Sequence, residues 1–261
     1  MGQLLNSIST LFAWIMIYFY NMVHSWGISI ILMTILLRLL LFPTSVSQVR
    51  SMEGMKRIQP LLKEIQNKYK DKPQEYQQKV METYKKHGVN PIMGGCLPML
   101  LQFPILIALY NLLRNPAKIF ANLTFNKSLM KGLIHKFETE VFMGMKLTDA
   151  NVLTNMNVKG MQHVEASHVL PFLILVFLSG ATTFILQKIS SPSNASGSDP
   201  DQSMQNTFLY IMQAFFTYIT YTLPAGLGIY WVVSNILTII QQITIVRYFI
   251  PKSSNPNQPP K

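Results

Sequence analysis

Charged residues are scarce in this chain. Asp, Glu, Lys and Arg make up only 13% of its 261 residues and 49% are hydrophobic, whereas soluble domains carry roughly 25% charged residues. Acidic residues are the rarest, with 11 against 22 Lys and Arg, so the net charge is +11. So few charges do not make an ordinary surface in water, which excludes a soluble enzyme. Alongside long apolar runs, the positive charge indicates contact with anionic lipid rather than nucleic acid.

Groups that carry covalent chemistry are also missing. The single cysteine, Cys96, lies in an apolar run and excludes a disulfide within the chain. The sequence shows no embedded Asp pair, no Ser–His pair within an apolar segment and no His/Cys/Asp cluster with metal-ligand spacing. The Gly94-Gly95 pair lacks the GxxxxGK[ST] pattern of a phosphate loop. We therefore predict no catalytic residue, no metal and no cofactor.

The apolar residues gather in segments long enough for membrane helices, which need about 20 mostly apolar residues. Pro98 and Pro104 fall inside the second segment, where neighbouring helices can satisfy the freed backbone groups. The apolar stretch 1–19 precedes the first span and is expected to form an interfacial amphipathic helix. The predicted fold is an all-α integral membrane protein with five transmembrane helices, at residues 20–46, 90–113, 168–189, 205–223 and 224–248.

A polar block, residues 47–89, separates the first two spans and carries ten Lys and Arg against five Asp and Glu. Pro60 predicts a kink or a later start in its first helix. Asp71-Lys72-Pro73 predicts a turn, with Pro73 as the first residue of a second helix. We expect an antiparallel helical hairpin outside the membrane. The apolar positions with helical period are Ile58, Leu62, Ile65 and Tyr69, then Tyr76, Val80 and Tyr84.

The basic hairpin sets the predicted orientation, because cytoplasmic segments carry an excess of Lys and Arg. With the hairpin in the cytoplasm and five spans, the N-terminus lies outside and the C-terminus inside. Loop 114–167 is then extracytoplasmic; its seven Lys and Arg against four Asp and Glu fit poorly, but long segments follow the rule weakly. The Ser-rich stretch 190–204 becomes a flexible cytoplasmic linker and 249–261 a disordered cytoplasmic tail.

Arg38 is the sharpest candidate for function, because it is flanked by apolar residues on both sides in the first span. A charge at the centre of a membrane helix costs about 2.5–3.5 kcal/mol on insertion scales, so such residues usually face protein or a water-filled cavity. The alternative is that Arg38, about one helical turn before Pro43, extends its side chain to the cytoplasmic headgroups.

Polar stripes on the other spans help to choose between these interpretations. Each stripe alone is explained by hydrogen bonds between helices, worth about 1 kcal/mol per contact. Several stripes together, with no acidic residue in any span to pair Arg38, favour a shared hydrophilic cavity of positive charge, which would attract an acidic or polar segment. The residues predicted to line this cavity are Arg38, Thr34, Gln102, Thr182, Thr183, Gln213, Trp231 and Asn235.

Several motifs run through nearly the whole chain in one order, and together they are specific. The chain resembles the YidC/Oxa family of membrane protein insertases, in its compact bacterial form. The motifs are Leu37-Arg38-Leu39-Leu40-Leu41-Phe42-Pro43, Gln59-Pro60 and Lys68-Tyr69-Lys70 in the basic hairpin, Gly88-Val89-Asn90-Pro91, Gly95-Cys96-Leu97-Pro98, Gln102-Phe103-Pro104-Ile105, His168-Val169-Leu170-Pro171, and Leu223-Pro224-Ala225-Gly226-Leu227-Gly228-Ile229-Tyr230-Trp231 with Ser234-Asn235.

The resemblance implies a bacterial plasma membrane protein of five core helices, with a groove open to the cytoplasm and to lipid. Arg38 would be the groove arginine that receives the polar flank of a substrate, with Trp231 near it. The implied partners are nascent membrane proteins, the Sec translocon, the ribosome and the lipid bilayer, with no nucleic-acid recognition. The rival hypothesis is a small channel or transporter, which would favour inverted repeats, and the sequence shows no self-similar halves.

Overall fold

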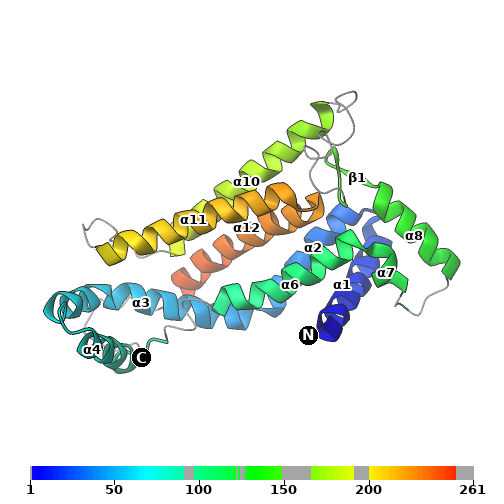
Figure 1. Ribbon diagram of the computed structural model, residues 1–261. Coiled ribbons are helices and arrows are strands. Elements are labelled where there is room, and N and C mark those ends of the chain that lie inside the picture. Colours follow the sequence, from blue (N-terminus) through cyan, green and yellow to red (C-terminus); the bar gives the residue numbers. More distant parts are fainter. Residues whose placement is uncertain are drawn as a thin grey trace.

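The computed structural model describes residues 2–90, 97–121, 123, 127–148, 166–190 and 200–250, and these residues are mostly helical. Figure 1 shows helices α3 (Phe42–Lys68) and α4 (Pro73–Lys86) at one end of the molecule, and α8 (Lys127–Thr139) with strand β1 (Val141–Phe142) at the other. The long helices run between the two ends. Expectations for 91–96, 149–165, the linker 191–199 and the tail from 251 lie outside the described residues.

The N-terminal apolar stretch forms two helices, α1 (Gly2–Val23) and α2 (Trp26–Leu40). The structure differs here from the expected boundary at residue 19, because α1 continues to Val23. The break falls where His24 adopts a left-handed backbone (φ 52°) and Ser25 an extended one. A left-handed residue ends a helix as glycine often does, but histidine gives no such signal in the sequence.

Helix α3 follows α2 after Leu41 at a bend of 64°. Pro43 lies in its first turn, where a proline costs no hydrogen bond. The later start expected from Pro60 is not seen, because α3 runs through this residue from Phe42 to Lys68. Pro60 is exposed, so the carbonyl that its ring leaves unpaired does not have to be buried in a core.

Helix α4 packs alongside α3 after a turn at residues 69–72. The chain returns to α3 through Gly88, which has φ 63°, and Val89. Val89 is buried against Gly54, where a Cβ atom would lie 2.8 Å from the valine side chain. Helix α4 itself has no buried residue. The predicted apolar positions of α4, Tyr76, Val80 and Tyr84, are half-buried, so this helix is only partly covered where it packs on α3.

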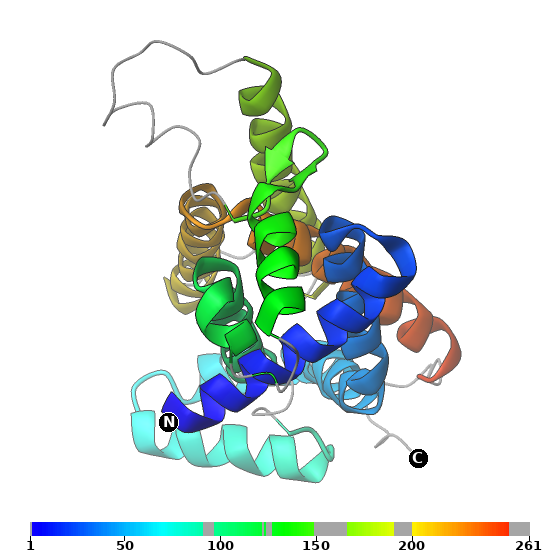
Figure 2. The same cartoon turned by 90° about the vertical axis from the view of Figure 1, so that its right-hand side faces the viewer.

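Three further helices and a short β-hairpin follow. Helix α6 (Leu97–Arg114) is followed by α7 (Pro116–Ala121) and α8. Strand β1 pairs antiparallel with β2 (Met145–Lys146) through a turn at Met143 and Gly144, both at positive φ. The expected loop 114–167 therefore contains regular structure. Figure 2 looks onto this end of the molecule, with α8 and the hairpin in front of the long helices.

The C-terminal half holds α10 (Ala166–Ser190), α11 (Pro200–Thr222) and α12 (Ala225–Tyr248). Helix α11 begins five residues before the span expected from 205. By length and composition, two described helices suit a membrane crossing, Val169–Ser190 and Ala225–Tyr248, and a third does if the bent α2–α3 pair counts as one span. A mostly helical membrane protein is therefore supported, and the number of five spans stays a prediction.

The core is most aromatic where α1, α2, α7 and α8 meet. Trp26, the first residue of α2, is fully buried and stacks on Tyr20 with ring centroids 4.2 Å apart. Phe137 of α8 meets the indole edge-on at 5.0 Å, and Phe120 of α7 lies at 6.0 Å. Large buried rings contribute most to such a core. The first turn of α2 is thereby fixed in place.

Candidate functional site

The guanidinium of Arg38 on α2 turns toward α12. Its Nε donates a hydrogen bond to the Ser234 hydroxyl at 3.1 Å, and Nη2 donates to the same oxygen. Gln241, two turns further along α12, donates from its amide to the Arg38 carbonyl at 3.1 Å. The ion pairs among the described residues lie in or beside α3 and α4, and none includes Arg38. The half-buried cation thus has hydroxyl rather than carboxylate partners.

A second group of polar contacts joins α10 to α12. The indole Nε1 of Trp231 donates to the Thr183 hydroxyl at 3.2 Å. The Asn235 amide donates to the same hydroxyl at 2.8 Å and to that of Thr182 at 3.2 Å. Phe216 of α11 stacks on Trp231 at 4.9 Å. Four of the predicted cavity residues therefore meet where α10 packs on α12: Thr182, Thr183, Trp231 and Asn235.

Helix α6 joins the same region through Gln102, whose amide donates to the Tyr230 hydroxyl at 2.7 Å. Tyr230 and Ser234 are both buried and lie one turn apart on α12. Neither was among the predicted cavity residues, although Ser234 belongs to the polar stripe of this helix. Most of the Tyr230 side chain is an apolar ring, so this residue does not stand out in a search for stripes of small polar residues.

Two predicted cavity residues make other contacts. Thr34 is fully buried one turn before Arg38, and its hydroxyl donates to the Ile30 carbonyl of its own helix at 2.6 Å. Gln213 of α11 donates to the Gly180 carbonyl of α10 at 2.8 Å. Neither side chain has a hydrogen bond to the other predicted cavity residues in these contacts. We call the residues that meet on and against α12 the polar cluster on α12. They are Arg38, Gln102, Thr182, Thr183, Tyr230, Trp231, Ser234 and Asn235.

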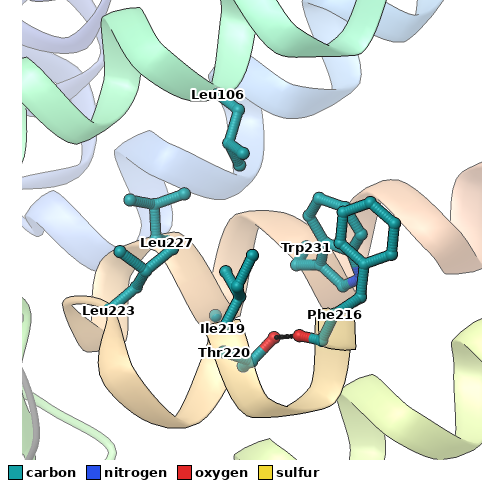
Figure 3. A pocket seen from close by; sticks show the side chains of 8 residues that line it. Leu106, Phe216, Ile219, Thr220, Leu223, Leu227 and Trp231 are labelled. Atoms are coloured by element: carbon teal, nitrogen blue, oxygen red, sulfur yellow. Dashed lines mark hydrogen bonds between the residues drawn. The ribbon is translucent and has the colours of Figure 1, made fainter. Parts of the chain in front are cut away.

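Two hollows lie near this cluster. A cavity of about 10 Å³ next to Trp231 has room for about one water molecule and is lined mainly by apolar side chains of α6, α11 and α12 (Figure 3). A wider apolar recess of about 510 Å³ lies open between α10 and α11, with Gln213 and Thr217 as its polar residues. Arg38 is not among the residues that line these two hollows.

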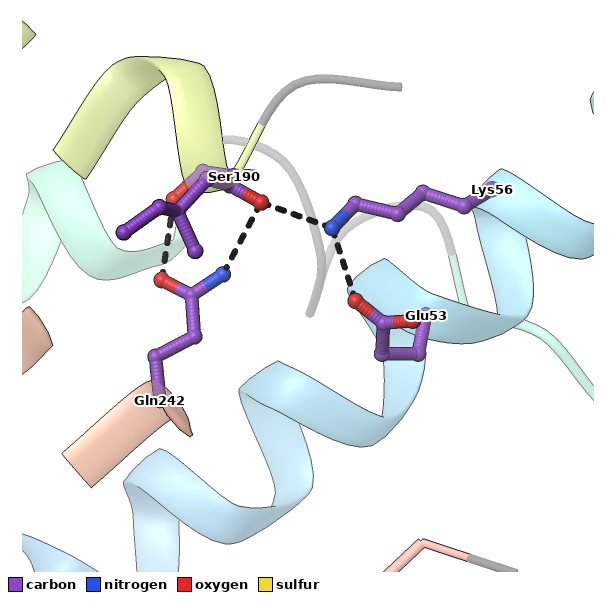
Figure 4. Close-up of polar contacts among 5 residues, drawn as sticks. Glu53, Lys56, Ser190 and Gln242 are labelled. Carbon is purple, nitrogen blue, oxygen red and sulfur yellow. Dashed lines mark hydrogen bonds and ion pairs between the residues drawn. The ribbon is translucent and has the colours of Figure 1, made fainter. Parts of the chain in front are cut away.

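A separate polar junction connects α3 to the end of α10 and to Gln242 of α12 (Figure 4). The Lys56 ammonium contacts the Glu53 carboxylate and the Ile189 carbonyl, each at 2.7 Å. Gln242 donates to the same carbonyl at 3.4 Å and accepts from the Ser190 hydroxyl at 3.1 Å. A cation at the carboxyl end of a helix is favourable. The sequence predicted no role for Lys56.

The long apolar helices and the polar contacts between them assign this chain to the class of helical membrane proteins. Residues 18–253 match the family described as 60Kd inner membrane protein. The chain therefore belongs to the YidC/Oxa family, which confirms the family expected from the sequence motifs.

Individual relatives agree with this assignment. Membrane protein insertase YidC of Chlamydia trachomatis is 37% identical over 228 residues, which cover 87% of this chain and 26% of the relative. YidC of Helicobacter pylori is 34% identical, with 87% and 34% covered. The chain thus spans about a quarter to a third of these relatives. YidC of Fusobacterium nucleatum is 34% identical over 230 residues, covering 88% of both chains.

A solved structure supports the same fold. It is described as an active YidC insertase with the first transmembrane domain resolved, and it matches with a TM-score of 0.55 and 25% identity. The match covers 94% of this chain and 47% of that one. The overall helical fold is therefore similar to that of a known insertase.

Proposed function

We propose that this chain is a membrane protein insertase, in which the polar cluster receives the polar flank of a nascent membrane protein. The observation that carries the proposal is Arg38, a half-buried cation that has no ion pair with any described residue. Its hydrogen bonds to Ser234 replace only part of the solvation that a guanidinium has in water. An acidic client segment would supply the missing countercharge.

The surroundings strengthen this attraction. Two charges interact several times more strongly in a partly desolvated site than in bulk water. Buried amides add hydrogen-bonding capacity: the Oε1 atom of Gln241 is buried and has no partner among the described residues. A peptide N–H group of a client would reach this atom only after the neighbouring helices move apart, because the atom is buried. Binding would be transient, because the Ser234 hydroxyl competes for the same guanidinium.

Release would follow from the hydrophobic effect rather than from covalent chemistry. The outer faces of α10 and α11 expose large apolar side chains, among them Phe177 and Phe215. An apolar client helix that leaves the cluster along such a surface enters lipid, which is favourable by roughly 25 cal/mol for each Å² of apolar surface removed from water. The proposed clients are nascent single- or double-spanning membrane proteins.

The proposed placement is the bacterial plasma membrane, with five spans, the N-terminus outside and the C-terminus in the cytoplasm. Helices α3 and α4 would form the cytoplasmic hairpin, since residues 47–89 carry twice as many basic as acidic residues. The Sec translocon and the ribosome are proposed partners on the basis of the family. The names of the relatives support the insertase activity itself.

Substitution of Arg38 tests the proposal. In liposomes that contain the purified protein, Arg38→Ala should lower insertion of a client with an acidic translocated flank about tenfold, a loss of roughly 1.4 kcal/mol. Arg38→Lys should retain most activity, because the positive charge remains. Insertion is measured by protease protection of the flank.

The controls separate charge at this site from charge in general. Arg50→Ala removes an exposed arginine of α3 and should leave insertion unchanged. A client with a neutral flank should depend less on Arg38 than the acidic client does. Equal insertion of the acidic client by the wild type and Arg38→Ala would remove Arg38 from the mechanism.

A further inference from the structure

Helices α2 and α12, which carry Arg38 and Ser234, lie parallel and in fixed register. Near their first turns, a Cβ atom on Gly226 would lie 3.1 Å from Ile30. Eight residues further along both helices, Arg38 contacts Ser234. Contacts that advance in the same direction by equal steps require a parallel pair. No short turn can join the starts of two parallel helices, so packing contacts, and not a direct connection, set their relative axial position.

One short segment, residues 140–147, contacts the first turns of both helices. On α2, the Glu140 carboxylate accepts the backbone N–H of Trp26 at 2.8 and 2.9 Å and that of Gly27 at 3.3 Å. It also accepts the Ser25 hydroxyl at 2.8 Å. On α12, the Leu147 carbonyl accepts the backbone N–H of Gly226 at 3.0 Å. The 140–147 segment thus connects two helix starts that are far apart in sequence.

The contact between this segment and α2 is close. A Cβ atom on Gly27 would lie 2.2 Å from the Phe142 ring, so the first turn of α2 accepts only glycine against this ring. Ser25, at the N-cap position, makes no side-chain cap of its own. Glu140 instead satisfies the free N–H groups at the helix start, where a negative charge is favourable.

Glu140 has no competing cation among the described residues, since none of their ion pairs includes it. Its charge is therefore directed at α2. Arg38 lies twelve residues beyond Trp26, about 18 Å along the axis at 1.5 Å per residue. A shift of α2 by one turn, about 5.4 Å, would separate Arg38 from Ser234.

We propose that Glu140 is a positioning residue for the polar cluster. By capping α2, it holds this helix in axial register with α12 through the 140–147 segment, and so places Arg38 opposite Ser234. This inference deepens the proposed function, because the cluster is the site of that function.

The far ends of the two helices offer a direct measure of register. Phe42 at the start of α3 and Phe249 after α12 have ring centroids 6.1 Å apart. In a Cys96→Ser background, Phe42→Cys with Phe249→Cys forms a pair for a short thiol-specific crosslinker. Its crosslinking rate is measured in native-like liposomes, and thermal unfolding shows whether each variant is folded.

The proposal predicts an ordered series. Glu140→Ala should slow crosslinking about fivefold, since it removes a charged cap with several hydrogen bonds. Glu140→Gln keeps an acceptor oxygen and should lie between Ala and the wild type. Glu138→Ala removes an exposed carboxylate of α8 and should not change the rate. If Glu140→Ala does not fold, the test is the comparison of the crosslinking rates of Glu140→Gln and Glu138→Ala.

A crosslinking rate that is the same in the wild type and in the Glu140 variants would overturn the positioning role. Equal slowing by Glu138→Ala would do so as well, because the effect would then be one of general charge. Insertion of an acidic client separates this inference from the proposed function. If register shifts while insertion is unchanged, Glu140 does position α2, and it is the role of the polar cluster in insertion that fails.

Discussion

At the residue scale, the structure decides how Arg38 is held. A charge this close to the end of a span could have reached the headgroups, and the sequence left that alternative open. The guanidinium instead donates to Ser234. Position and apolar flanks predicted the residue, but not its partner, which lies 196 residues away. Gln213 lies apart from Arg38, where its amide donates to the Gly180 carbonyl of α10, and its predicted role stays a prediction.

The Gln102–Tyr230 hydrogen bond leads to a prediction at the same scale. Tyr230→Phe and Gln102→Leu should each destabilise the protein, and together by about 1 kcal/mol less than the sum, because the two side chains share one bond. The free energy of unfolding in detergent measures this double-mutant cycle. Tyr218→Phe, at an exposed tyrosine, combined with Gln102→Leu should be additive. Additivity of the first pair would show that the bond contributes nothing.

At the scale of elements, the predicted helix boundaries agree with the structure where the composition of the sequence changes. They differ from it where the backbone angle of a single residue ends a helix. Pro73 begins α4 as predicted from the turn before it. The break at His24 depends on a left-handed residue without a glycine signal. The hairpin of β1 and β2 has only two residues in each strand, which is too short for an alternating pattern to show.

The Lys56 junction gives a prediction for elements. Lys56→Ala removes the cation from the carboxyl end of α10, a contact worth about 0.3–1 kcal/mol. Amide hydrogen exchange in the last turn of α10 should therefore become roughly two- to fivefold faster, measured by mass spectrometry of the liposome-embedded protein. Lys70→Ala, at an exposed lysine after α3, should leave exchange unchanged. An unaltered rate in Lys56→Ala would show that α3 does not stabilise this helix end.

At the scale of the whole molecule, composition predicted a helical membrane protein and the motifs predicted its family, both of which the fold and the relatives support. The number of spans stays a prediction, because two described helices suit a membrane crossing and a third does if the bent α2–α3 pair counts as one span. Which helices meet depends on contacts such as Glu140 with Trp26, 114 residues apart. No local pattern contains that information.

The central claim is that the polar cluster on α12 receives the polar flank of a client, and site-specific photocrosslinking tests it most directly. A photoreactive phenylalanine at Trp231 is compared with one at Phe177, which is 74% exposed on α10 and lines the recess between α10 and α11. With a stalled nascent membrane protein that carries an acidic flank, the Trp231 probe should crosslink to the flank, and Arg38→Ala should reduce this product. Equal flank crosslinking from both positions, unaffected by Arg38→Ala, would contradict the account.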